Sequence, residues 1–564
     1  WSGMLAAPGS ERQGIRAQAD RWDATAAVWG TGGGLAGPPA RQPAAVASSS
    51  LAQALATLPG VGPSANVAAS MSSAIDRCPG RRFRAGVLQV VLAALTGLVL
   101  GARSARAVPI DEPHVGGIGF SGPTTGDLAA IYWNPAALGL MHGLHITFSG
   151  TGRLSNTRVA RGPSAGGTAP EVVASDKQHP FVWPPGPGAF AGISYDVGGD
   201  RLALAGAVYM PFLDRSSYQS SSTNPIETLS TRYHRISADL RNLALATAVA
   251  VRLAGDFRLG FAPTVLLSTG RLSFAESTCS SGAPCEDPAA DARIDAGSNQ
   301  GIFSSKAAVT LNAGLYFRRR NWEYGLAFST RPLGGAVGSS AVILGDQTRV
   351  LRAPRDVTAG GPAAVVCDNM RDDGRGCVFA DIIYKLPWML TGAVTWHPRP
   401  GWEVTALERI LSFPADDVID IRLTGRNLAQ AGVPAHIVLY RGFGTVFDTR
   451  VRVSNWVTER VRVGAGLRFE SSSLPERAVS PAAVDNRKFE PTAMIEVHAG
   501  RHVWLNAGYG FTYMLPVTVS SPAASACAAP GGDLAAAPCA RATADGNYRH
   551  FEHDFSLSLN TQFW

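Results

Sequence analysis

The connections between apolar segments alternate strictly between very short and long from residue 143 onward. Short links follow every second segment, at 198–200, 254–257, 320–322, 399–402, 455–458 and 500–502. Short turns on one side and long polar loops on the other are typical of transmembrane β-barrels, whose strands are segments of about ten residues. The fourteen predicted strands are 143–160, 187–197, 201–213, 241–252, 258–275, 305–319, 323–332, 382–398, 403–413, 437–453, 459–474, 488–499, 502–515 and 550–564.

Alternation within the segments supports the same fold. From Arg460 to Glu470, valine, alanine, leucine and phenylalanine occupy one face, and arginine and glycine occupy the other. One face suits lipid and the other a wet lumen. A soluble β-sandwich remains the alternative, since it also buries one face, but it does not require alternating loop lengths. The tryptophans beside short links predict an interfacial aromatic girdle: Trp322, Trp402, Trp456 and Trp504.

The N-terminal region divides into two predicted parts. Residues 1–70 are rich in Ala, Gly, Ser and Pro, which indicates a disordered or mis-assigned extension. Residues 71–107 contain an arginine cluster, an apolar run and the small residues Ala105–Ala107, the order of a secretory signal peptide. A transmembrane anchor is the alternative, because the apolar run is about long enough. Cleavage would make Val108 the first residue of the mature protein.

The net charge of +7 does not indicate a nucleic-acid partner. Residues 1–107 contain ten arginines, no lysine and four acidic residues, so the remainder is nearly neutral. Only 16% of the residues are charged, below the level of about 25% in soluble proteins.

Six cysteines fall in pairs within long connections. In an exported chain such pairs predict disulfides, here within external loops. Metal binding is the alternative, but no Cys-x-x-Cys motif is present and no histidine lies at ligand spacing. The predicted pairs are Cys279 with Cys285, Cys367 with Cys377, and Cys527 with Cys539.

The stretch "GDLAAIYWNPAALGLM" resembles the N-terminal signature of the FadL family of outer-membrane transporters for hydrophobic compounds. The matching positions include Asp127, Asn134, Pro135 and Ala136. Residues 386–413 and 461–497 resemble later parts of the family, so the similarity spans about 110–564. The resemblance implies a periplasmic plug, or hatch, at 108–142 and a barrel at 143–564. On the residues alone, Asn134 bonds backbone and Pro135 fixes a turn or helix start.

The resemblance further implies a monomer in the outer membrane of a Gram-negative bacterium. It would take up long-chain fatty acids or aromatic hydrocarbons by pocket capture, hatch rearrangement and lateral release. Its expected partners are the hydrophobic ligand, membrane lipid and the barrel assembly machinery. A general porin, or an adhesive barrel that binds a surface partner, is the alternative.

No catalytic, cofactor or metal site is expected. The glycines at 117, 119 and 122 match a dinucleotide fingerprint, but no strand precedes them and no βαβ unit follows. His142 with His145, and His550 with His553, are separated by three residues on predicted strands, so their side chains face opposite sides.

A lateral opening is expected near the third strand. Pro211 cannot donate a ladder hydrogen bond, so it requires an edge or a bulge, and a closed barrel has no edges. The neighbouring Phe212 belongs to the stretch "MPFLD", which is similar to a family motif. Kinked third strands that open toward the membrane are a property of that family, and Gly206 predicts the bend at 205–208. The alternative is that Pro211 simply ends the strand.

Overall fold

The computed structural model describes residues 114–161, 172–177, 188–197, 199, 201–218, 229–277, 291–297, 305–333, 340–345, 349–352, 379–414, 417–424, 435–520 and 544–563. The predicted extension 1–70, the signal peptide 71–107 and residues 108–113 lie outside this part of the chain. The six paired cysteines also lie outside it, namely Cys279, Cys285, Cys367, Cys377, Cys527 and Cys539.

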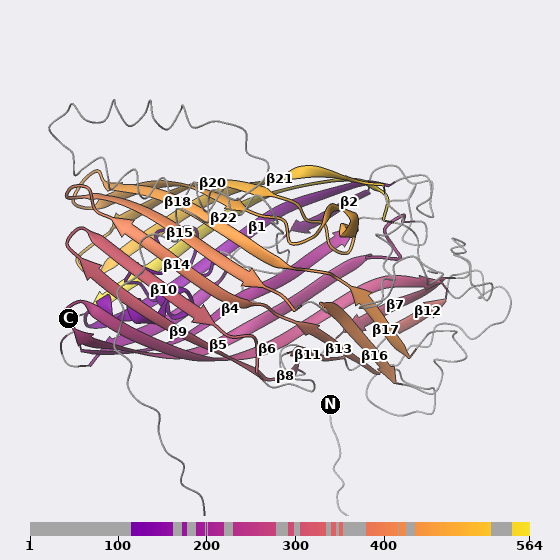
Figure 1. The fold of residues 1–564 in the computed structure, drawn as a ribbon, viewed down its shortest axis with the longest axis horizontal. Coiled ribbons are helices and arrows are strands. Elements are labelled where there is room, and N and C mark those ends of the chain that lie inside the picture. The colour runs from indigo at the N-terminus through magenta and orange to yellow at the C-terminus, as the bar shows by residue number, and fades with distance from the viewer. Residues whose placement is uncertain are drawn as a thin grey trace, which may run out of the picture. The chain divides into compact units, whose positions relative to one another are not determined.

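Fourteen antiparallel strands form a closed ring, as the sequence predicts (Figure 1). The ring closes where Leu144–Arg161 pairs with Gly546–Phe563, so the first and last strands are neighbours. In ring order the strands are β1 (Leu144–Arg161), β3 (Phe190–Asp196), β4 (Leu202–Tyr218), β5 (Ser237–Ala254), β6 (Phe257–Ser277), β9 (Ala308–Arg319), β10 (Trp322–Ser329), β14 (Trp388–Trp396), β15 (Trp402–Ser412), β18 (Thr445–Trp456), β19 (Val461–Glu470), β20 (Lys488–His498), β21 (Val503–Val519) and β22 (Gly546–Phe563).

A second sheet continues five of these strands on the side of the long connections (Figure 1). Its strands are β8 (Ser305–Lys306), β11 (Ser340–Gly345), β13 (Phe379–Lys385), β16 (Val418–Thr424) and β17 (His436–Tyr440). They pair in the same order as β9, β10, β14, β15 and β18, to which each is adjacent in the chain. Three further strands, β2 (Val172–Lys177), β7 (Asp291–Gly297) and β12 (Arg349–Arg352), extend the barrel sheet.

The break between the two sheets corrects three predicted strands, of which 305–319 is divided into β8 and β9. The segment 382–398 is divided into β13 and β14, and 437–453 is divided into β17 and β18. Gly442 has φ of 68°, a left-handed conformation that turns the chain between β17 and β18. Beside it, the buried carboxylate of Asp417 is paired with the guanidinium of Arg441.

The outer surface of the barrel is apolar. Phe148 is 57% exposed on β1, Ile193 is 50% exposed on β3 and Leu467 is 54% exposed on β19. On β22 the buried Ser556 and Ser558 alternate with the exposed Phe555 and Leu557. This pattern confirms the predicted lipid-facing alternation. Among the described residues, no helix is long and apolar enough to cross a membrane.

Candidate functional site in the barrel interior

The segment His114–Met141, here called the inner segment, lies within the ring of strands. It contains helix α4 (Ala130–Trp133) and the 3-10 helix η1 (Pro135–Leu140), and both are almost completely buried. η1 packs against β4, β5, β6 and β9. The inner segment covers the described part of the predicted plug 108–142 and contains its four motif residues.

Asn134 connects the two short helices to each other and to the barrel wall. Its Nδ2 donates to the carbonyl oxygen of Pro123 at 2.7 Å and to that of Leu315 on β9 at 2.9 Å. Its Oδ1 accepts from the backbone N–H of Ala136 at 3.1 Å, which caps η1. Pro135 occupies the first turn of η1, where its missing N–H costs nothing.

Asp127 organises the chain that precedes α4. Its carboxylate accepts from the Ser121 hydroxyl at 2.5 Å and from the N–H of Ala130 at 3.1 Å. Burial raises the pKa of Asp127 to about 6, and these two hydrogen bonds partly offset the effect. The Asp127 carboxyl therefore changes its charge near pH 6.

Glycines in the wall leave the space that the inner segment fills. A β-carbon on Gly260 of β6 would overlap the backbone of Pro135 and Ala136, and one on Gly314 of β9 would overlap the Asn134 side chain. Gly508 of β21 stands in the same relation to the carbonyl of Ile118. Glycine inside a strand often marks such a close approach of another backbone, so inward-facing strand glycines were a usable sequence signal for this contact.

Polar wall residues that the sequence reasoning missed hold the inner segment as well. Asn312 of β9 donates to the carbonyl of Tyr132 at 2.7 Å, and Arg258 of β6 donates to that of Gly139 at 3.1 Å. Arg409 of β15 donates to the Tyr132 hydroxyl at 3.0 Å. The sequence around each of these three residues is that of any barrel strand. Only the plug atom opposite it in the structure reveals its role.

A row of aromatic rings runs from the inner segment to the wall. Trp133 and Tyr132 lie edge to face at 5.0 Å between ring centroids, and Tyr132 meets Tyr209 of β4 at 5.6 Å. Tyr209 stacks on Phe190 of β3 at 6.0 Å. All four side chains are buried.

The row ends where the strand ladder of the wall is interrupted. β3 pairs with residues 144–149 of β1 and 203–209 of β4. β2 pairs with 154–159 of β1 but with only Ser217 and Tyr218 of β4. Within the described chain, residues 150–153 of β1 pair with β22 on one edge and with no strand on the other.

The three residues expected near a lateral opening all lie in β4, at different distances from this interruption. Gly206 is paired on both sides, with Ile193 of β3 and Thr247 of β5. The register against β5 shifts between Tyr209 and Phe212, and Pro211 lies within that shift. The irregularity expected at 205–208 is therefore found a few residues further along, because Pro211 has no N–H for the ladder.

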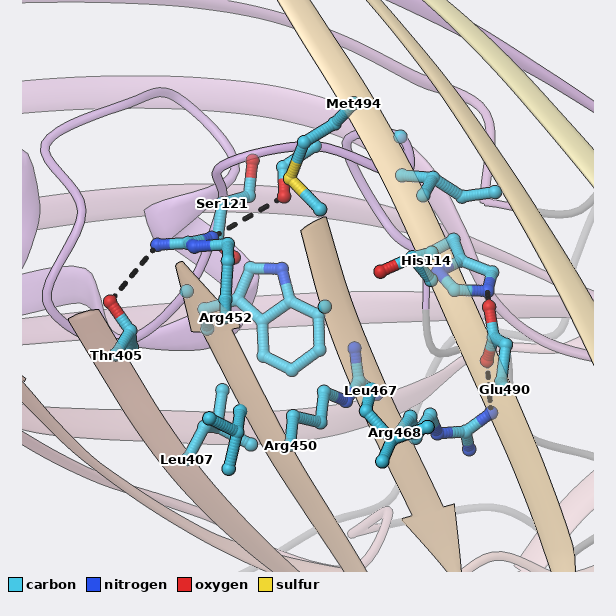
Figure 2. A pocket seen from close by; sticks show the side chains of 18 residues that line it. His114, Ser121, Thr405, Leu407, Arg450, Arg452, Leu467, Arg468, Glu490 and Met494 are labelled. Carbon is cyan, nitrogen blue, oxygen red and sulfur yellow. Dashed lines mark hydrogen bonds and ion pairs between the residues drawn. The ribbon is translucent and has the colours of Figure 1, made fainter. Parts of the chain in front are cut away.

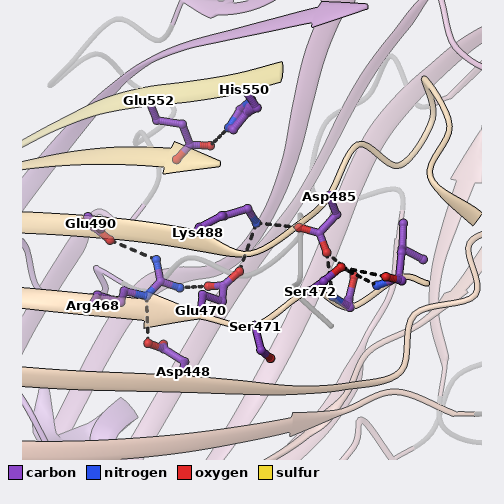
Figure 3. A network of polar contacts seen from close by, with 12 residues as sticks. Asp448, Arg468, Glu470, Ser471, Ser472, Asp485, Lys488, Glu490, His550 and Glu552 are labelled. Atoms are coloured by element: carbon purple, nitrogen blue, oxygen red, sulfur yellow. Dashed lines mark hydrogen bonds and ion pairs between the residues drawn. The ribbon is translucent and has the colours of Figure 1, made fainter. Parts of the chain in front are cut away.

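The lumen side of β18, β19 and β20 is charged (Figure 3). Arg468 of β19 binds the carboxylate of Asp448 at 2.9 Å and that of Glu490 at 3.0 Å, and it also contacts Glu470. Lys488 joins Glu470 at 3.1 Å. The buried charges are paired, as the energetic cost of burial requires. These charged residues of β18, β19 and β20 are here called the ionic half of the interior, and the aromatic row ends at β3 and β4.

A small cavity lies between the inner segment and the ionic half (Figure 2). Its volume is about 70 Å³, enough for a few water molecules. Trp133, His114, Arg450, Arg452 and Glu490 are among the residues that line it. The Trp133 ring lies 5.4 Å from the Arg409 guanidinium and 5.0 Å from that of Arg450.

The fold is similar to solved FadL-type barrels. A FadL homologue of Pseudomonas aeruginosa matches with a TM-score of 0.61 at 12% identity, over 82% of this chain and 100% of that chain. The toluene transporter TbuX of Ralstonia pickettii matches with a TM-score of 0.52 at 12% identity, over 79% and 97%. The toluene transporter TodX of Pseudomonas putida matches with a TM-score of 0.50 at 12% identity, over 82% and 99%. No family model and no curated protein matches the sequence.

The fold also indicates which membrane the protein occupies. A closed antiparallel barrel with an apolar outer band, short turns on one side and long loops on the other is the architecture of the Gram-negative outer membrane. The chain is therefore an outer-membrane β-barrel of FadL type by fold.

Proposed function

We propose that this chain, which has the fold of the FadL-type outer-membrane transporters, takes up hydrophobic small molecules. Long-chain fatty acids and aromatic hydrocarbons are the candidate substrates, in keeping with the relatives described as toluene transporters. The inner segment is the plug of this channel. The substrate is captured from outside, held in the lumen beside the aromatic row, and released when the plug rearranges.

The observation that carries this proposal is the interruption of the ladder between the described strands beside the aromatic row. Among the described residues, 150–153 of β1 pair only with β22, and the register of β4 against β5 shifts between Tyr209 and Phe212. Tyr209 stacks on Phe190, which pairs with Ser149 of β1 directly before this stretch. A molecule that leaves here passes from aromatic side chains directly into lipid. This route spares it contact with water, which costs about 0.8 kcal/mol per methylene group.

The plug explains why such a barrel does not leak. Its backbone is hydrogen-bonded to the wall at opposite sides of the ring, through Asn312 of β9 and through Ser556 of β22, whose hydroxyl accepts from the N–H of Ile118 at 2.8 Å. A segment held at both sides obstructs the lumen. Passage then requires the plug to change its contacts, and Tyr132 couples it to the aromatic row.

Uptake by intact cells tests the proposal. Cells that lack their own hydrophobic transporter would express the protein and receive a labelled fatty acid, toluene or a sugar of similar mass. We expect faster accumulation of at least one hydrophobic compound than in cells with an empty vector, and no change for the sugar. Faster sugar entry would indicate a general porin. Binding of cells to a surface without any uptake would indicate an adhesive barrel.

A further inference from the structure

We propose that His114, Glu490 and Asp554 form a binding site for a divalent transition-metal ion between the plug and the barrel wall. His114 begins the described part of the plug, Glu490 belongs to β20 and Asp554 to β22. All three side chains are buried, and one ligand atom from each lies within 4.8 Å of the others. Figure 2 shows His114 and Glu490 facing each other.

The distances suit a shared ion after small side-chain movements. His114 Nε2 lies 2.8 Å from Glu490 Oε1. Zn²⁺ binds imidazole nitrogen at about 2.0–2.1 Å and carboxylate oxygen at about 2.0–2.2 Å. Two ligands of one ion then lie about 3–4 Å apart, and the ligand atoms of this group all lie within 4.8 Å of one another.

Each carboxylate is held by an arginine through one oxygen only. Asp554 Oδ1 accepts from Arg153 Nε at 2.8 Å, and Glu490 Oε2 accepts from Arg468 at 3.0 Å. Asp554 Oδ2 is buried and has no hydrogen-bond partner among the residues that the structure describes. A buried carboxylate oxygen without a partner is costly, and a cation in this position would satisfy it.

Each of the two arginines also has another acidic partner, so neither belongs to the proposed site alone. Arg153 lies 3.4 Å from Glu552, and Arg468 also binds Asp448 and Glu470. The arginines orient the carboxylates from behind, as outer-shell hydrogen bonds commonly do at metal sites.

The donor set selects the class of metal. One imidazole nitrogen with two carboxylate oxygens suits Zn²⁺, Co²⁺ or Ni²⁺, whereas Ca²⁺ and Mg²⁺ prefer oxygen ligands alone. The cavity of about 70 Å³ borders both His114 and Glu490. It gives room for a water molecule as a further ligand.

Metal binding would link His114, the first described residue of the plug, to the wall strands β20 and β22 through coordinate bonds. Release of the plug would then depend on the metal, a consequence that rests on the proposed function. The site itself does not rest on it. Metal binding is measured without a transported substrate, so its failure and a failure of uptake are separate results.

The test uses full-length, tag-free protein in detergent, stripped with a chelator and titrated with Zn²⁺ by calorimetry. Co²⁺ absorption in the visible range gives a second readout. We expect one equivalent to bind the wild type, and H114A and D554N each to weaken binding by at least about tenfold. D554N keeps the side-chain shape, so it guards against a failure to fold.

H498A is the matched control. His498 Nε2 also contacts a strand glutamate, Glu496, at 2.9 Å, but this pair belongs to no three-residue group among the described residues. Its binding should equal that of the wild type. The proposal is wrong if the wild type shows no saturable binding. It is equally wrong if H114A and D554N bind as tightly as the wild type, since the ion would then lie elsewhere, for instance on cysteines.

Discussion

Asn134 of the plug and Gly314 of β9 share one small volume. The side-chain oxygen of Asn134 lies where a β-carbon of residue 314 would stand, and the amide nitrogen of Asn134 donates to the next carbonyl of the same strand, that of Leu315. Because residue 314 has no side chain, the wall leaves the space that the Asn134 side chain occupies. Sequence positions 180 residues apart are fitted to each other.

Gly260→Ala should displace the plug while the barrel still assembles. The added methyl group would overlap the backbone of Pro135 and Ala136, and overpacking of this kind costs about 1–3 kcal/mol. We expect higher ion conductance in planar bilayers than for the wild type. Gly206→Ala is the control, because the nearest atom to its β-carbon is Ala246 O at 3.9 Å. Equal conductance of the two variants would contradict the inference that Gly260 makes room for the backbone of Pro135 and Ala136.

Asn134→Asp should release the plug about as much as Asn134→Ala does. Both variants lose the two N–H donors to Pro123 and Leu315, and each buried carbonyl left without a partner costs about 1–3 kcal/mol. Limited proteolysis with mass spectrometry should show faster cleavage within 114–141 in both variants. If Asn134→Asp is cleaved like the wild type, the cap to Ala136 alone holds the plug.

A reversible cross-link tests the lateral route. Ala191 and Val208 are opposite partners of β3 and β4 next to the interruption, and Tyr195 and Leu204 are partners further from it. Opposed antiparallel residues lie about 4.5–5.5 Å apart, within disulfide range. Oxidised Ala191→Cys with Val208→Cys should slow hydrophobic uptake, and a reductant should restore it. The pair Tyr195→Cys with Leu204→Cys, and reductant on the wild type, serve as controls. Unchanged uptake in the first oxidised pair would mean that substrate leaves elsewhere.

Asp127 should make plug docking dependent on pH. Its pKa is raised by burial to about 6, above the ordinary value of 3.8, so the docked state binds a proton more tightly than the undocked state. Docking therefore becomes less favourable as the pH rises from about 4 to about 6 and levels off above that. Conductance should rise over the same interval. Asp127→Asn, which does not titrate, should give a flat profile, and a profile like that of the wild type would assign the effect to another group.

The strand count could be read from the sequence because alternation is local. A pleated strand turns successive side chains to opposite faces, so 459–474 and 488–499 predict β19 and β20 without knowledge of their neighbours. The same local rule does not reveal where a strand is interrupted. It runs on through 437–453, where Gly442 separates β17 from β18.

The motif at the plug was also visible, but its contacts were not. Asn134 and Pro135 indicate a cap and a helix start from their own chemistry. Asn312, Arg258 and Arg409 carry no such local signal, because a polar residue on an inward strand face is common to every wet lumen. Their function depends on which plug atom comes to lie opposite them.

The sequence by itself determined the number of strands, the faces they turn to lipid and the existence of a compact segment before the barrel. The tertiary structure decided that the ladder breaks beside Pro211 rather than at Gly206, and that His114, Glu490 and Asp554 meet. The physical reason is the sequence separation of the residues that interact. Alternation and capping are set within a few residues, whereas these meetings depend on how fourteen strands close into one ring, and ring closure fixes a register that no single segment contains.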